Sequence, residues 1–81
     1  MFDKVLIVDK DLIEALELTN SLEELGYEVL DVVESGKLAM QYILDIRPDF
    51  VVLNIDQNDI SMIESAVNMI KSSIPIVYCV K

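Results

Sequence analysis

The chain has 81 residues, of which 53% are hydrophobic, and a net charge of −9 from 6 Lys and Arg against 15 Asp and Glu. This length predicts one small domain at residues 1–81, and an acidic chain without a basic stripe is not expected to bind nucleic acid or an anionic membrane surface. No apolar run reaches the roughly 18 residues of a membrane span, and residues 1–4 do not open a signal peptide, so we expect a cytoplasmic protein.

Cysteine, histidine and glycine usage excludes several kinds of site. The single Cys79 lies in an apolar run, which rules out a disulfide framework and a cysteine zinc site. The chain has no histidine, so it cannot build histidine metal sites or Ser-His triads. Neither GxGxxG nor GxxxxGK[ST] occurs, which argues against nucleotide binding of those kinds.

The first third of the chain predicts a strand, a helix and a second strand. Lys4–Val8 is an apolar run without alternation, typical of a strand covered on both faces. Asp11 and Glu14 form a capping-box pattern that starts a helix, and Gly26 ends it. The second strand is expected at Tyr27–Val33.

The middle of the chain repeats this alternation. A second helix is expected to open at Ser35 or Gly36 and to run to about Ile46. Pro48 ends it, because the residue before a proline disfavours the helical region. Phe50–Ile55 is a second unbroken apolar run and predicts the third strand.

The last part predicts a third helix and a fourth strand. Ser61 and Glu64 form a second capping-box pattern, and the helix is expected to fade at Ser72 and Ser73. Ile74–Val80 predicts a strand. The order βαβαβαβ, with short connections, predicts an α/β fold with a doubly wound parallel sheet. We expect the strand order 2-1-3-4, with the first helix on one face and the other two on the opposite face.

Polar residues follow two of the predicted strands and suggest a site. Asp9, Lys10 and Asp11 follow the first strand, and Asn54 and Asp56 lie at the end of the third. Ligands of open parallel sheets gather at the carboxyl ends of the strands. If these two strands are neighbours, the five residues converge on one small patch.

Five segments of the chain carry a resemblance to a known family. They are Lys4–Asp9, Leu25–Val29, Ser35–Ala39, Arg47–Leu53 and Ile74–Val77. Together they resemble the receiver domain of the response regulators of two-component systems, along essentially the whole chain. The resemblance implies the flavodoxin-like fold, a role in signal transduction and a protein partner, either a histidine kinase or an output domain.

The resemblance also implies that the chemistry of the family has degenerated here. Receivers accept a phosphoryl group on an Asp at the end of the third strand, a position that falls on Asn54. The acidic pair that holds Mg²⁺ falls on Asp9 and Lys10, and an ammonium repels the cation. The hydroxyl residue that closes the fourth strand falls on Val80. The next strand of the family, with its lysine, would lie beyond residue 81, so the chain is expected to be truncated after the fourth strand.

Two functions remain open from the sequence. The first is a pseudo-receiver, which is not an enzyme, needs no cofactor and acts through protein–protein contacts. The alternative is an active phosphorelay receiver that uses Asp56 or Asp9 with weakly bound Mg²⁺. These two residues are the candidate metal ligands, although no metal is expected.

Three of these residues also have an explanation that involves structure alone. Asp9 could cap the following helix, although Asp11 is better placed to do so. Asn54 could be a turn residue. Lys10 is either a solvated surface lysine or a cation that offsets the repulsion among the acidic side chains around it.

The fourth strand suggests association. Ile74–Val80 is apolar on both faces, and no later element of the chain is left to cover its outer edge. An exposed apolar edge strand pairs readily with another chain, so a homodimer through this edge is expected. The other explanation is that the 81 residues are a fragment of a longer protein whose remaining segment covers the edge.

Overall fold

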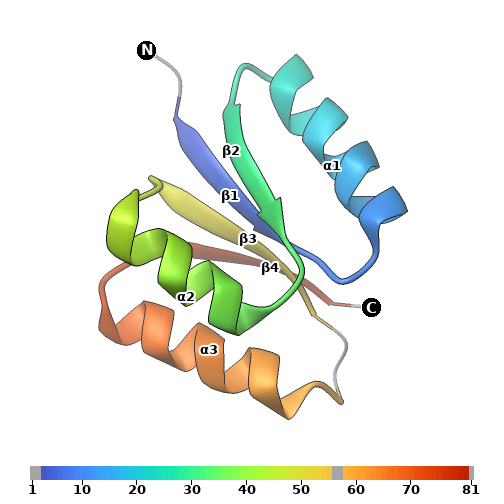
Figure 1. The fold of residues 1–81 in the computed structure, drawn as a ribbon. Coiled ribbons are helices and arrows are strands. Elements are labelled where there is room, and N and C mark those ends of the chain that lie inside the picture. The colour runs from blue at the N-terminus through green and yellow to red at the C-terminus, as the bar shows by residue number, and fades with distance from the viewer. Residues whose placement is uncertain (1–2, 56–57, 81) are drawn as a thin grey trace.

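The computed structural model describes residues 3–55 and 58–80. Strands and helices alternate along the chain, as Figure 1 shows. The elements are β1 (Lys4–Val8), α1 (Leu12–Glu24), β2 (Glu28–Val33), α2 (Gly36–Asp45), β3 (Phe50–Ile55), α3 (Ile60–Lys71) and β4 (Ile76–Val80). None of the helices described is long and apolar enough to cross a membrane.

The four strands form one parallel sheet in the order β2-β1-β3-β4. Helix α1 covers one face, and α2 and α3 lie side by side on the other (Figure 1). The α/β doubly wound fold, the strand order and the distribution of the helices predicted from the sequence are therefore confirmed.

The core explains why the central strands have unbroken apolar sequences. Leu6 and Val8 pack under α2 and α3, whereas Val5 and Ile7 point to the α1 side, and all four side chains are fully buried. A strand covered on both faces needs an apolar residue at every position. Strand β3 follows the same rule from position 51 to position 53.

Three of the predicted helix boundaries are confirmed by the hydrogen bonds at the helix ends. The Asp11 carboxylate accepts from the backbone N–H groups of residues 13 and 14 at the start of α1. Ser35 caps α2, because its Oγ accepts from the backbone N–H of Leu38 at 3.1 Å. Gly26 has a φ of 96°, a left-handed conformation that glycine adopts without a steric cost after the last turn of α1.

The start of α3 differs from the prediction. Asp59, and not Ser61, is the N-cap, and its Oδ1 accepts from the backbone N–H of Met62 at 3.0 Å. Ser61 lies inside the first turn instead. An aspartate caps a helix at least as well as a serine does, so the residue nearer the end of β3 starts the helix.

Strand β4 begins two residues later than predicted. Ser73 has a φ of 61°, and the pairing with β3 starts at Ile76. Pro75 has no N–H to donate to a neighbouring strand, but its carbonyl oxygen accepts from the backbone N–H of Val51 at 2.9 Å. The chain therefore enters the sheet only after the proline.

A glycine allows α2 and α3 to approach closely. A Cβ atom at Gly36 would lie 2.2 Å from Ser65 Oγ and 2.3 Å from Ser65 Cβ, well inside contact distance. The first turn of α2 therefore packs directly on the middle of α3. This contact fixes the position of α3 over β3 and β4.

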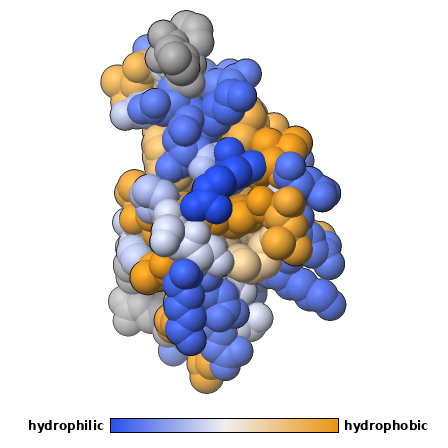
Figure 2. Space-filling model, turned by 90° about the vertical axis from the view of Figure 1, so that its left-hand side faces the viewer, coloured by the Kyte–Doolittle hydropathy of each residue, from blue (hydrophilic) through white to orange (hydrophobic). Residues whose placement is uncertain are grey.

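Large apolar side chains are also exposed on the surface. On the face shown in Figure 2, hydrophobic atoms lie between hydrophilic ones instead of being covered by them. The exposed apolar residues include Leu12, Ile13 and Leu16 of α1 and a row of residues on α3. Single exposed apolar residues are normal on proteins, whereas a contiguous row of them needs an explanation.

Candidate functional site

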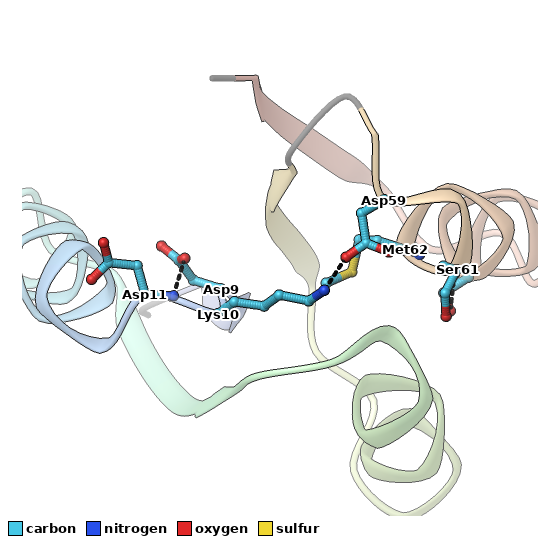
Figure 3. Close-up of polar contacts among 7 residues, drawn as sticks. Asp9, Lys10, Asp11, Asp59, Ser61 and Met62 are labelled. Carbon is cyan, nitrogen blue, oxygen red and sulfur yellow. Dashed lines mark hydrogen bonds and ion pairs between the residues drawn. The ribbon is translucent and has the colours of Figure 1, made fainter.

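The candidate site lies where β1 and β3 end beside each other. Val8 of β1 is paired with Leu53 of β3, so the residues that follow them, Asp9 and Asn54, are adjacent. The loop from β1 leads directly into α1, and Asp59, the N-cap residue of α3, lies across from it (Figure 3). Four of the five residues predicted to converge, Asp9, Lys10, Asp11 and Asn54, thus lie together at the carboxyl edge of the sheet, whereas Asp56 lies outside the described residues.

Asp9 is a buried carboxylate at the centre of this site, with 1% of its surface exposed. Its Oδ1 accepts from the backbone N–H of Asp11 at 2.8 Å, and its Oδ2 accepts from Asn54 Nδ2 at 2.8 Å. Its own backbone N–H donates to the carbonyl oxygen of Val33 at 2.9 Å. Both carboxylate oxygens thus have donors, as a buried charge requires.

Asn54 connects two carboxylates. Its Nδ2 donates to Asp9 Oδ2 and to Glu14 Oε2, both at 2.8 Å. An amide NH₂ has two N–H groups, so one asparagine can satisfy both acceptors without adding charge. A hydrogen bond to an ionised group stabilises a protein by about 1.5–3 kcal/mol. The amide therefore holds together two acidic groups that would otherwise repel each other.

Glu14 is a site residue that the sequence analysis did not identify as one. Its pairing with Asp11 predicted a reciprocal capping box, but the Asp11 N–H donates to Asp9, and Glu14 Oε2 accepts from Asn54. Glu14 lies in the first turn of α1, which begins beside the strand ends. That position was the one available signal that its side chain could reach the site.

Lys10 connects the site to α3. Its Nζ forms an ion pair with Asp59 Oδ2, and Figure 3 shows the side chain extended from the end of β1 toward the start of α3. The Lys10 side chain is 66% exposed, whereas that of Asp59 is 12% exposed. Among the described residues, the ion-pair partner of Lys10 is therefore Asp59, which the sequence analysis did not place in the site.

Two of three comparisons with known proteins found similar proteins. No family model matches the chain. A protein-glutamate methylesterase/protein-glutamine glutaminase from Archaeoglobus fulgidus is 32% identical over 53 residues, 65% of this chain and 15% of that protein. The signal receiver domain of a modulated diguanylate cyclase from Desulfovibrio desulfuricans matches with a TM-score of 0.88 and 30% identity, over 99% of this chain and 66% of that one. In sequence and fold the chain resembles the receiver domains of response regulators.

A more distant likeness supports the same fold. The receiver domain of the response regulator PhyR from Erythrobacter litoralis has a TM-score of 0.83 at 17% identity, over 98% of this chain and 63% of that one. The chain thus spans less than two thirds of the length of each of these three proteins. The activities of those whole proteins are therefore not assigned to this receiver.

The positions that receiver domains use for chemistry are differently occupied in this chain. Asn54 stands at the phosphoacceptor position, and the Asp9–Lys10 pair at the metal-ligand position. Asp56 lies outside the described residues, as does the side chain of Val80, whose backbone is paired with that of Ile55. Within residues 3–55 and 58–80, no group of three or more acidic or Cys side chains is placed to hold a metal ion.

A depression of about 610 Å³ opens above these residues. Its lining consists of Asp9, Lys10, Asp11, Leu12, Ile13, Asn54, Asp59 and Met62. Its lining thus combines the polar groups at the strand ends with the exposed apolar side chains of Leu12 and Ile13 of α1. The Lys10–Asp59 ion pair crosses from β1 to α3 at this depression (Figure 3).

Asp59→Asn should make the free energy of unfolding less dependent on pH in the acidic range. The hydrogen bond from Lys10, together with that from the Met62 N–H, holds the pKa of Asp59 below its ordinary value of 3.8. A folded-state pKa that is lowered adds stability above the unfolded value, and this stability disappears as the pH falls through the lower folded value. Urea unfolding from about pH 5 to pH 2 measures the change.

Two further variants control this measurement. Lys10→Gln should flatten the profile in the same way, because it removes the larger of the two causes. Asp45→Asn, at an exposed position, should leave it unchanged. An Asp59→Asn profile with the slope of the natural protein would show that the ion pair contributes nothing in solution.

Proposed function

We propose that this receiver domain transmits signals through protein–protein contacts and does not accept a phosphoryl group. The observation that supports the proposal is the Asn54 amide, which donates to Asp9 and to Glu14 at the position of the phosphoacceptor. An amide oxygen is a far weaker nucleophile than a carboxylate, and an acyl phosphate cannot form on it. The domain then needs no catalytic activity and no cofactor.

Magnesium binding is disfavoured for the same reason. Mg²⁺ requires near-octahedral oxygen ligands and loses its bound water reluctantly. Asp9 has both oxygens occupied by N–H donors, and Glu14 Oε2 accepts from the amide. A cation would have to break these hydrogen bonds before it could bind.

The alternative is an active receiver that uses Asp9 or Asp56. Asp9 has only 1% of its surface exposed, so its carboxylate is poorly accessible to a phosphoryl donor. Each of its two oxygens also accepts a hydrogen bond, which reduces the nucleophilicity of the carboxylate. Asp56 lies outside the described residues, and the mass measurement below tests it directly.

The partner is proposed to be a protein, either a histidine kinase or an output domain. One structural neighbour, the anti-anti-sigma factor PhyR from Bartonella quintana, has been solved in complex with the anti-sigma factor NepR. This likeness, at 20% identity over 33% of that protein, concerns the fold alone, and the complex is a property of PhyR. A homodimer through the edge of β4 is a second proposal, since β4 is paired with β3 alone among the described strands.

Incubation with acetyl phosphate and Mg²⁺, followed by intact-mass measurement, should show no phosphoryl adduct. An active receiver treated in parallel serves as the positive control. Beryllium fluoride with Mg²⁺, which mimics an aspartyl phosphate, should leave the amide NMR signals of Asn54 and its neighbours unshifted. A stable adduct located on Asp9 or Asp56 by peptide mapping would establish the active-receiver alternative instead.

A further inference from the structure

Helix α3 has a second apolar face that no described residue covers. Its first apolar face consists of Met62, Ala66 and Met69, which are at most 2% exposed and pack on the sheet. The second is a row that we call the α3 stripe, with exposed fractions of 70% for Ile60, 43% for Ile63, 44% for Val67 and 56% for Ile70. A helix that only covers a sheet needs one apolar face.

The spacing of the α3 stripe is that of a helix–helix interface. Its members follow one another at intervals of three, four and three residues, the repeat that forms the seam between two helices of a coiled coil. We propose that the α3 stripe packs against the α3 stripe of a second copy of this chain, antiparallel and around a two-fold axis near Val67.

The charges beside the stripe support a second copy as the occupant. Glu64 and Lys71 are exposed and lie one position after Ile63 and Ile70, on the same flank of the stripe. In an antiparallel pair centred on Val67, Ile63 faces Ile70 of the second copy, and Glu64 faces its Lys71. The two-fold axis repeats both contacts, so the surface is complementary to itself in shape and in charge.

A parallel arrangement lacks this complementarity. It would place the glutamates and lysines of the two copies on opposite sides of the seam, so neither would meet a partner of opposite charge. The antiparallel pair is therefore the arrangement that the residues favour.

The edge of the sheet extends the same surface. Helix α3 packs against β4, which ends the sheet, and Ile76 contributes to the core under α3. Tyr78 points to the same side as Ile76, because side chains alternate along a strand, and it is 48% exposed. A stable interface buries about 800 Å² on each partner, more than three helical turns supply alone. Tyr78 continues the apolar surface beyond the α3 stripe, and the β4 edge lies next to it.

The proposed dimer uses residues other than Asp9, Asn54 and Glu14. It gives the protein-contact function a specific surface, but it does not depend on whether Asn54 accepts a phosphoryl group. The mass measurement above and the association measurements below can therefore fail separately.

Sedimentation equilibrium over a concentration series tests the surface. The natural chain should dimerise, and Val67→Asp should weaken the dimer by about 100-fold or more, because it buries two carboxylates at the axis. Asn68→Asp adds the same charge one residue away, off the stripe, and should leave the dimer intact. Circular dichroism of each variant establishes that it is folded.

Charge exchange tests the orientation. Glu64→Lys or Lys71→Glu alone should weaken the dimer by about tenfold, since each change creates two like-charge contacts. The two changes together should restore it, because the pairs are re-formed with the signs reversed. Glu64 and Lys71 are both exposed on the single chain, so neither change threatens the fold.

Disulfide trapping gives the sharpest geometric result. In a Cys79→Ser background, Val67→Cys should cross-link to itself under mild oxidation. Ile63→Cys should not, since the two copies of residue 63 lie eight residues apart along the pair, or about 12 Å at 1.5 Å per residue. A mixture of Ile63→Cys and Ile70→Cys chains should cross-link.

Several outcomes would overturn the proposal. They are a chain that stays monomeric at all concentrations, a dimer that is unaffected by Val67→Asp, and a cross-link between two copies of residue 63. The first would mean that another segment or protein covers the α3 stripe. The second would place the dimer contact elsewhere, and the third would establish a parallel pair.

Discussion

Asn54→Asp is expected to destabilise the domain by about 2–4 kcal/mol at neutral pH. The natural amide donates one hydrogen bond to Asp9 and one to Glu14, and each such bond to an ionised group contributes about 1.5–3 kcal/mol. A carboxylate at this position donates nothing and adds a third negative charge beside two others. For a small domain this is a large share of a total stability of about 5–15 kcal/mol.

Acid and magnesium should each reverse this loss. Protonation of a crowded carboxylate removes the repulsion, so the deficit of Asn54→Asp should be largest at neutral pH and shrink as the pH falls. Mg²⁺ supplies positive charge to three hard oxygen ligands and should raise the midpoint of urea unfolding of the variant only. Since the Lys10 ammonium pairs with Asp59, a further Lys10→Asp change is not expected to be required for the ion to bind.

A matched control variant distinguishes the effect of the position of the substitution from the effect of the added charge. Gln41→Glu makes the same amide-to-carboxylate change at an exposed position of α2 and should alter the free energy of unfolding by less than about 0.5 kcal/mol. If Asn54→Asp behaves like this control, or if Mg²⁺ stabilises both variants equally, the amide does not hold the two carboxylates together.

Asp9→Ala is expected to cost about 2–4 kcal/mol, comparable to the effect of Asn54→Asp. The change removes two hydrogen bonds at 2.8 Å and leaves the backbone N–H of Asp11 without its acceptor at the entrance to α1. A buried donor without a partner costs about 1–3 kcal/mol in addition to the lost bond. Urea unfolding at pH 7 measures the total.

Asp45→Ala provides the comparison for this variant. Asp45 is exposed at the end of α2, so its truncation should be close to neutral. Asp9→Asn should lie between the two, because an amide keeps one acceptor oxygen but places an NH₂ group against a donor. An Asp9→Ala variant as stable as Asp45→Ala would show that the buried carboxylate is not structural.

The local sequence determined the elements and their arrangement. The unbroken apolar runs at Lys4–Val8 and Phe50–Ile55 predicted two central strands, because only a strand covered on both faces lacks polar positions. Asp11, Ser35 and Gly26 marked helix ends, since caps act within a few residues along the chain. The strand order followed from the alternation of strands and helices, which leaves few right-handed topologies.

The tertiary structure decided the contacts of the site. Asn54 reaches Asp9 and Glu14 across 45 and 40 residues of sequence. No pattern along the chain shows that the Glu14 side chain turns away from the helix end toward β3. The sequence predicted that the residues at the strand ends converge, but which donor meets which acceptor depends on how α1 packs on the sheet.

The ion pair between Lys10 and Asp59 was likewise decided by the tertiary structure and not by the local sequence. The sequence placed Lys10 among acidic residues and gave no reason to choose Asp59, which precedes the predicted start of the third helix. Once α3 is positioned against α2 through Gly36 and Ser65, the start of α3 comes within reach of Lys10. Short-range patterns thus located the helices and strands, apart from the exact starts of α3 and β4. The pairing of charges followed from the packing of whole elements, because a charge pair depends on distance in space and not along the chain.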